Sequence, residues 1–293
     1  MRERLGVGVA ILSSAVGGGA AVATRYLVAG ADPFTLAAIR FGGGVICLLP
    51  IALGLRVRWP AGSDRLRVAG LGLLFFAVFF VFYNLALAYT SVARGTLALS
   101  TLPLMTMLAG ALLGAEALSA RKSLGVAIAM GGVAAALASG FATAPPGAWH
   151  GDLIMVGATL CMALYNVWSR PFIARSSALG FLTAGMLAGA AALVLISGLS
   201  GGMAQVRGFT LSQWAAALYL AAGGGALAFF LWVWALQHAS PTQVANTMTI
   251  NPIVAGFLAA SLLGEPLTFN LVIGLIAVFV GIWLATTERA APR

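Results

Sequence analysis

Apolar runs of about 20 residues recur along the whole chain, and short stretches with proline, glycine or charge separate them. A helix of about 20 residues is long enough to cross a hydrocarbon core of about 30 Å. Only helices and closed barrels satisfy their backbone polar groups there. Barrel strands would alternate polar and apolar residues over about 10 positions, and these runs show no such alternation. The sequence therefore predicts an all-α membrane protein.

The scarcity of charge supports the same interpretation. Only 8% of the 293 residues are charged and the mean hydropathy is +1.02, whereas a soluble domain carries roughly 25% charged residues. We expect ten transmembrane helices, at approximately 5–24, 34–54, 69–89, 95–113, 122–138, 151–169, 179–198, 212–236, 243–262 and 268–286.

The first of these runs has an alternative interpretation. Arg2 and Arg4 precede it and it reaches Ala21-Val22-Ala23, so the segment resembles a cleavable signal peptide. The apolar part of a signal peptide is about 7–15 residues long, however, and this run is longer. We therefore expect the run to be kept as the first membrane helix.

The basic residues predict how the helices are oriented. With ten spans, 12 of the 16 Lys and Arg residues lie on the side that holds both termini, three lie on the opposite side, and Arg40 lies within a span. The positive-inside rule then predicts a multi-pass inner-membrane protein with both termini in the cytoplasm. The basic residues form no basic face, so we expect no nucleic-acid partner.

The chain contains an internal repeat. When the sequence is shifted by 149 positions, Tyr83–Leu137 aligns with Trp232–Thr286 without a gap, and 11 of the 55 paired positions are identical. Each half would hold five spans, an odd number, so the second half must enter the membrane inverted relative to the first. Inverted repeats are typical of transporters. We expect two five-helix repeats, 1–138 and 151–293, joined by a loop at 139–150.

The repeated positions carry a family resemblance. In the second half they are Ala235, Leu236, Ser240, Pro252, Leu263, Gly264, Glu265, Leu267 and Gly274. This pattern resembles the EamA-type ten-helix transporters of the drug/metabolite transporter superfamily, and the first half departs from it where Ala115 separates Gly114 from Glu116. Length and loop pattern also resemble the YddG-type amino-acid exporters. The resemblance implies export of aromatic amino acids, methionine or threonine, or of organic cations. It also implies a central cavity among the first, third, fourth, sixth, eighth and ninth helices, with the fifth and tenth peripheral.

The sequence holds no constellation typical of an enzyme. His150 and His238 lie on opposite sides, and no metal-ligand pattern, P-loop or nucleophile motif occurs, so we expect no enzyme activity, metal or cofactor. Cys47 and Cys161 both lie in apolar runs, which does not suggest a disulfide. All seven Asp and Glu residues fall at span ends or in loops. Because coupled transporters usually use intramembrane carboxylates, we expect a facilitator, or coupling by another route.

Neutral polar and aromatic residues are then the candidates for a substrate site, since ligand pockets are mostly apolar with a few placed polar groups. The candidates are Phe79, Phe80, Tyr83, Asn84, Ser100, Thr101, Tyr165, Asn166, Trp168, Phe229, Trp232, Asn246, Met248 and Asn251. Tyr83 and Trp232 occupy equivalent repeat positions. An aromatic residue near a span end can instead belong to the interfacial belt, and a buried Asn can instead bond a neighbouring helix.

Two pairs of repeated residues are candidates for gating or structural roles. Pro103 and Pro252 remove a backbone hydrogen bond at equivalent places in the fourth and ninth spans, so each makes either a gating kink or a static bend. Glu116 and Glu265 end those two spans on opposite faces of the membrane. There a carboxylate meets the positive N-terminal dipole of the following helix, and we expect a mainly structural role.

Arg40 lies inside the second span. We expect it to have a gating or structural role. We expect it to pair with Asp32 or Glu265 and so to fix the outer end of the bundle. A guanidinium in a central cavity would instead bind a substrate carboxylate.

Three functions fit these features. The first is a transporter of small organic solutes, amino acids above all, that works by alternating access in the lipid bilayer as a monomer. The second is a multidrug or other metabolite carrier of the same superfamily. The third is a channel-like or scaffolding membrane protein.

Overall fold

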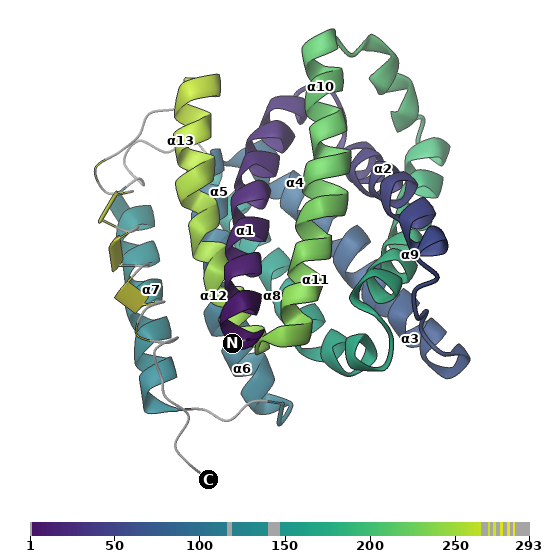
Figure 1. The fold of residues 1–293 in the computed structure, drawn as a ribbon. Helices are drawn as coiled ribbons and strands as arrows, with labels where there is room; N and C mark the ends of the chain where they lie inside the picture. Colours follow the sequence, from purple (N-terminus) through teal and green to yellow (C-terminus); the bar gives the residue numbers. More distant parts are fainter. Residues whose placement is uncertain are drawn as a thin grey trace.

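The part of the chain that the structure describes is helical throughout (Figure 1). The computed structural model describes residues 2–115, 119–139 and 147–264, with scattered positions between 269 and 284. Its α-helices are α1 (Arg2–Leu27), α2 (Pro33–Gly54), α3 (Gly62–Gly72), α4 (Phe80–Tyr89), α5 (Val92–Leu99), α6 (Leu102–Leu112), α7 (Ala120–Ser139), α8 (Ala148–Arg175), α9 (Ala178–Leu199), α10 (Leu211–Tyr219), α11 (Ala228–His238), α12 (Pro241–Asn246) and α13 (Asn251–Leu263). Tighter or wider helical turns join some of them: η1 (Leu73–Phe79), η3 (Gly202–Gly208), η4 (Leu220–Leu227) and η5 (Thr247–Ile250).

Seven helices within these residues are long and apolar enough to cross a membrane. Three of them are composite, because η1 joins α3 to α4, η4 joins α10 to α11, and η5 joins α12 to α13. In the expected fourth and fifth spans the structure has shorter apolar helices, Leu102–Leu112 and Ser123–Gly132. The expected span at 268–286 falls mostly outside the described residues. The all-α membrane fold is therefore established, and the number ten stays a prediction.

Side-chain caps set where several of these helices begin. Asp32 accepts two backbone N–H bonds from the first turn of α2, at 2.9 and 3.1 Å, which satisfies donors that have no partner within the helix. Ser91 accepts from the N–H of Arg94 at 3.4 Å at the start of α5. Ser240, the repeat equivalent of Ser91, accepts from the N–H of Gln243 at 3.3 Å at the start of α12. A repeated serine thus begins equivalent helices in both halves.

The two halves also share their helical irregularities. The π-helical turn η1 lies in the middle of the third span, and η4 lies at almost the equivalent place in the eighth. The fourth span is interrupted between α5 and α6, and the ninth is interrupted by the 3₁₀ turn η5 before α13. Interruptions of this kind in a helix often mark functional sites.

Equivalent segments run in opposite directions. The chain passes from α3 to α4 away from the end of the bundle that holds the N-terminus, whereas it passes from α10 to α11 toward that end (Figure 1). In the same way α5 leads toward that end through α6, and α12 leads away from it through α13 (Figure 1). Opposite directions of equivalent helices are what an inverted repeat produces.

The repeated Leu-Gly phrase ends two of these helices. Gly114 follows α6 with φ +65°, and Gly264 follows α13 with φ +69°. Glycine adopts this left-handed conformation without the steric cost that a Cβ brings, which is why it so often ends a helix. Glu116 and Glu265 come just after these turns and lie outside the described residues.

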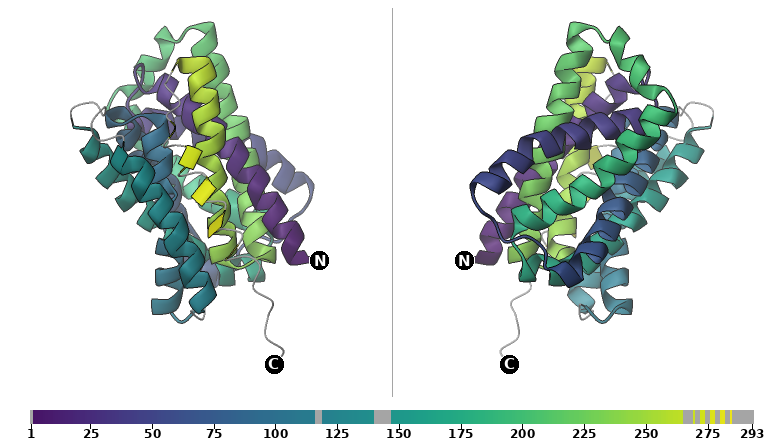
Figure 2. Two further views of the ribbon diagram at one scale, coloured as in Figure 1. Left: turned by 90° about the vertical axis from the view of Figure 1, so that its left-hand side faces the viewer. Right: turned by 90° about the vertical axis from the view of Figure 1, so that its right-hand side faces the viewer.

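Close helix crossings hold the bundle together. A Cβ on Gly18 of α1 would lie 2.8 Å from the carbonyl oxygen of Asn251 and 2.9 Å from the Cβ of Val254, so α1 and α13 touch through this glycine (Figure 2). Lipid tails are as apolar as the bundle interior, so helices in a membrane associate through such close packing rather than through exclusion of water.

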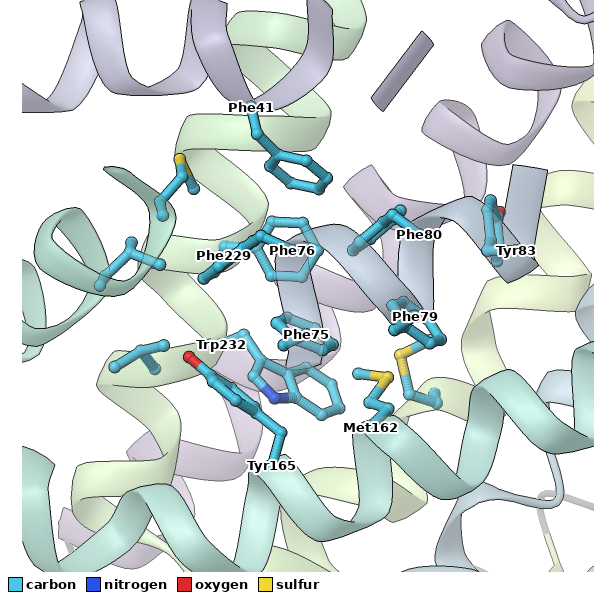
Figure 3. Close-up of a cluster of buried hydrophobic side chains, with 14 of the residues drawn as sticks. Phe41, Phe75, Phe76, Phe79, Phe80, Tyr83, Met162, Tyr165, Phe229 and Trp232 are labelled. Atoms are coloured by element: carbon cyan, nitrogen blue, oxygen red, sulfur yellow. The ribbon is translucent and has the colours of Figure 1, made fainter. Parts of the chain in front are cut away.

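Aromatic side chains fill the centre of the bundle (Figure 3). The ring of Phe75 stacks on Tyr165 at 4.2 Å and on Phe79 at 5.1 Å between ring centroids. Its edge-to-face partners include Phe80 and Phe229, at 5.7 and 5.3 Å. Such pairs add about 0.5–1.5 kcal/mol each beyond the area they bury, so this cluster fixes how α4, α8 and α11 face one another.

Candidate functional site

A small cavity lies midway along the bundle, beside the aromatic cluster. Its volume is about 40 Å³, whereas pockets for small organic ligands measure about 300–1,000 Å³. It has room for only a few water molecules, since each needs about 10–15 Å³ of space open to a water-sized sphere. Its lining residues are Ser13, Ser14, Gly17, Arg40, Phe79, Phe80, Tyr83, Leu99, Met162, Ala228, Phe229, Trp232, Met248 and Asn251. An organic solute can therefore enter only when the helices move apart.

The structure brings half of the predicted pocket residues to this cavity. They come from η1, α4, α11, η5 and α13, and they are Phe79, Phe80, Tyr83, Phe229, Trp232, Met248 and Asn251. Tyr83 and Trp232, which are equivalent in the repeat, therefore line the same cavity from opposite halves of the chain.

Three other candidates do not line the cavity but contact neighbouring parts of the bundle. Asn166 accepts a hydrogen bond from the indole N–H of Trp232 at 3.0 Å, which fixes the orientation of that ring. Tyr165 is buried in the aromatic cluster against Phe75. The side chain of Asn84 donates to the carbonyl oxygen of Pro33 at 2.9 Å and so joins α4 to the start of α2.

The remaining four candidates do not reach the cavity. Ser100, Thr101 and Asn246 are buried beside the interruptions of the fourth and ninth spans. Trp168 is 41% exposed and lies with Pro171 in a groove on the outside of the bundle. An exposed indole on a membrane helix matches the belt interpretation better than the pocket interpretation.

Sequence reasoning missed part of the lining. Ser13 and Ser14 face the cavity from α1, and Leu99, Met162 and Ala228 complete the missed set. The signal in the sequence that could have identified them is the pair of adjacent hydroxyl residues, Ser13 and Ser14, in the middle of an apolar run. Ser13 donates to the carbonyl oxygen of Ala228 at 2.7 Å, and Ser14 bonds the hydroxyl of Thr247 at 3.1 Å, so both join α1 to the second half.

The expected ion pair between Arg40 and Asp32 is not formed. The carboxylate of Asp32 instead caps α2 and accepts from the hydroxyl of Thr35. The guanidinium of Arg40 points into the bundle, where its Nε and Nη2 donate to the carbonyl oxygen of Gly224 at 3.2 and 3.0 Å. The other expected partner, Glu265, lies outside the described residues. Arg40 thus lines the central cavity, and the carboxylate of Asp32 is not its partner.

Pro103 and Pro252 lie where a helix starts. Each is in the first turn of its helix, α6 or α13, where the missing N–H removes no helical hydrogen bond. The expected kink is therefore a local break in regular α-helix: the turn at residues 100–101 before α6, and the 3₁₀ turn η5, which continues the ninth span, before α13. It places the N-termini of α6 and α13, their positive dipole ends, in the middle of the bundle. In transporters with discontinuous helices such ends face anionic groups of the substrate.

Ion pairs join the helices at both ends of the bundle. Arg94 at the start of α5 pairs with Asp152 near the start of α8, and these side chains are only 9% and 15% exposed. At the opposite end Arg175 binds both carboxylate oxygens of Asp64, at 2.9 and 3.1 Å, but its own side chain is 53% exposed. The first pair is thus shielded from water and the second is half solvated.

Asp152→Asn is expected to destabilise the protein by about 2 kcal/mol, because it leaves the poorly exposed charge of Arg94 without its carboxylate. Asp64→Asn is the matched control and should have a clearly smaller effect, since the exposed Arg175 regains water. Thermal unfolding of both purified variants in the same detergent measures the difference. Equal losses would show that burial does not distinguish the two pairs.

The family model for the EamA-like transporter family matches this chain twice, at residues 4–138 and 149–287. The chain belongs to the EamA-like transporter family. The two matches cover almost its whole length, and their boundary falls near residues 139–148, between α7 and α8.

Several relatives extend this result. The uncharacterized transporter YyaM of Bacillus subtilis is 23% identical over 92% of this chain and 89% of its own length. The uncharacterized protein PA1977 of Pseudomonas aeruginosa is 32% identical over 88% and 85%. The uncharacterized inner membrane transporter YedA of Escherichia coli K12 is 27% identical over 80% and 76%. One crystal structure of a protein superposes with a TM-score of 0.71 at 22% identity, covering 97% of this chain and 96% of that one, which shows a shared fold.

These matches establish the general character of this EamA-like protein. It is a multi-pass membrane protein, and its relatives indicate a transporter rather than an enzyme. A small-molecule substrate and a lipid bilayer fit that class. The matches do not extend to the amino-acid-exporter subgroup that the sequence resembles.

Proposed function

We propose that this EamA-like protein carries small organic solutes across the inner membrane by alternating access through the central cavity. The observation that carries the proposal is the position of that cavity, which lies where the interrupted fourth and ninth spans approach each other. These two spans are equivalent in the repeat and run in opposite directions (Figure 1). Opposed equivalent helices around one midplane site provide two related gates, one for each side.

The arrangement in the membrane forms part of this proposal. Ten transmembrane helices would form two inverted five-helix repeats, 1–138 and 151–293, with both termini in the cytoplasm. The distribution of basic residues supports this orientation. The Arg94–Asp152 pair would then close the outer end and the Asp64–Arg175 pair the cytoplasmic end.

The substrates that we propose are amino acids, namely the aromatic ones, methionine and threonine. The rings of Phe79, Phe80, Phe229 and Trp232 around the cavity offer an apolar surface for such side chains. A multidrug carrier would use a similar surface, so a substrate panel must separate the two.

Counterflow in proteoliposomes tests this function. Vesicles loaded with unlabelled phenylalanine, methionine or threonine should take up the labelled amino acid transiently and with saturation, whereas vesicles without protein should not. Counterflow of lipophilic drugs with no effect of amino acids would favour the multidrug alternative. Unsaturable flux, or none with any solute, would favour a channel or a scaffold and contradict the proposal.

A further inference from the structure

We infer that Arg40 is the anion-binding group of the central cavity, and that it binds the carboxylate of the carried solute, which is a monocarboxylate with an aromatic or apolar body. This inference rests on the proposal that the cavity is the transport site. It goes further, because it makes the carboxylate the essential group of the solute and an ammonium group dispensable.

The guanidinium of Arg40 is buried but not saturated. The side chain lines the cavity and the residue is 4% exposed. Its Nε and Nη2 share one acceptor, the carbonyl oxygen of Gly224, while Nη1 has no hydrogen-bond partner. A guanidinium offers five N–H donors in a planar fork. Donors therefore remain at the cavity for an incoming acceptor, and a carboxylate matches their geometry.

The positive charge of Arg40 is also uncompensated within the described residues. Each carboxylate there is engaged elsewhere: Asp32 with the start of α2, Asp64 with Arg175, Asp152 with Arg94 and Glu3 with Gln243. What surrounds the guanidinium is aromatic. Its carbon atom lies 4.5 Å from the ring centroid of Phe80 and 5.6 Å from that of Phe229. Aromatic faces offset only part of the cost of burying a cation, so a bound anion is the partner that this charge lacks.

The irregular turn η4 explains why Arg40 can sit there. A Cβ on Gly225 would collide with the carbonyl oxygen of Arg40, and a Cβ on Gly224 would lie 2.7 Å from the Cβ of Ala20. The glycines thus allow α2 to cross η4 at backbone contact. At that crossing the carbonyl oxygen of Gly224 accepts from Arg40 and holds the guanidinium at the cavity wall.

The rest of the cavity defines the body of the solute. Phe79, Met162 and Trp232 present apolar surface, and no acidic side chain is among the lining residues that the structure describes. One acceptor is available, because the side-chain oxygen of Asn251 is buried without a partner. It can receive one N–H or O–H of the solute. A carboxylate at Arg40 with a ring against Trp232 fits this wall, whereas an amine without a carboxylate would place a second cation beside the first.

Three compounds with the same ring test the inference: phenylalanine, 3-phenylpropionate and 2-phenylethylamine. Phenylalanine carries both a carboxylate and an ammonium group. 3-Phenylpropionate carries only the carboxylate, and 2-phenylethylamine carries only the ammonium group. Binding to the purified full-length protein is measured as the rise in its thermal unfolding midpoint with ligand concentration. We expect phenylalanine and 3-phenylpropionate to stabilise the protein and 2-phenylethylamine to have no effect.

Arg40→Gln should weaken the binding of both carboxylates about tenfold or more, since it removes a charge-assisted hydrogen bond. Arg40→Lys keeps the charge but loses the fork, and should retain part of the affinity. The control is Arg207→Gln, in the exposed turn η3, which should bind like the wild type.

The outcomes separate this inference from the proposed function. If 2-phenylethylamine binds as well as phenylalanine does, or if no carboxylate binds, the anion site is refuted while saturable counterflow of another solute still supports the transporter. If carboxylates bind through Arg40 but no solute shows counterflow, the anion site stands and the transport function fails. If Arg40→Gln does not fold, the binding of the three compounds to the wild type and to Arg40→Lys still shows whether Arg40 binds the carboxylate.

Discussion

Replacing Gly72 with alanine is expected to destabilise the protein by about 3 kcal/mol or more, because overpacking that cannot relax through a flexible side chain is costly. Gly72 of α3 crosses Gly185 of α9 at backbone contact. A Cβ at position 72 would lie 2.6 Å from the carbonyl carbon and 2.7 Å from the Cα of Gly185. The two helices must separate, and α3 leads directly into η1, which carries Phe75 and Phe79 of the aromatic cluster.

Gly70→Ala is the matched control for this prediction. It lies one half-turn earlier on α3, and nothing stands within 4 Å of the position that its Cβ would take. Alanine there should be neutral, or stabilising by up to about 1 kcal/mol, because it is the better helix former. Thermal unfolding of the purified proteins in one detergent compares them. Similar midpoints for the two variants would mean that α3 and α9 do not cross at Gly72.

Trp232→Ala is expected to lower counterflow more than tenfold and to destabilise the protein by about 3 kcal/mol, a usual loss for a large buried aromatic residue. Trp232 is 2% exposed and forms part of the cavity wall. Its removal also leaves the side-chain oxygen of Asn166 without the indole donor at 3.0 Å. Both the shape of the site and the support behind it are therefore lost together.

Trp168→Ala is the control, because both tryptophans are candidates by sequence and only the structure separates them. Trp168 is 41% exposed on the outside of the bundle, so its removal should leave the unfolding midpoint and the counterflow rate nearly unchanged. Transport that depends on Trp168 and tolerates Trp232→Ala would place the site in the outer groove and contradict the central-cavity proposal.

Much of the fold could be predicted from the sequence because membrane helices follow simple physical rules. The apolar runs gave the helices of the described chain to within a few residues, except that α3 and α8 extend past their expected spans. Proline and the repeated serines were informative as well: Ser91 and Ser240 cap equivalent helices. The sequence did not reveal that Pro103 follows a break between two helices and that Pro252 follows a 3₁₀ turn. A proline in an apolar run looks the same whether it bends one helix or starts another.

The candidate site was predicted only in part, for a reason specific to membranes. In a soluble protein the apolar face of a helix points inward, so periodicity shows which residues meet. A membrane helix is apolar on all sides, because lipid and bundle interior are equally apolar. The sequence could therefore propose Trp168 and Trp232 with equal justification. In the packed bundle, however, Trp168 lies on the outside and Trp232 lies at the central cavity.

By itself, the sequence determined that this chain crosses a membrane as helices, that it is built from a repeat, and which residue types could form a substrate site. The tertiary structure alone decided where the guanidinium group of Arg40 lies. Its partner is not a carboxylate, which a sequence could suggest, but the backbone carbonyl of Gly224, which has no signature in the residue types. Backbone contact between α2 and η4 brings that carbonyl within reach, and only the rotation and crossing of packed helices can create such a contact.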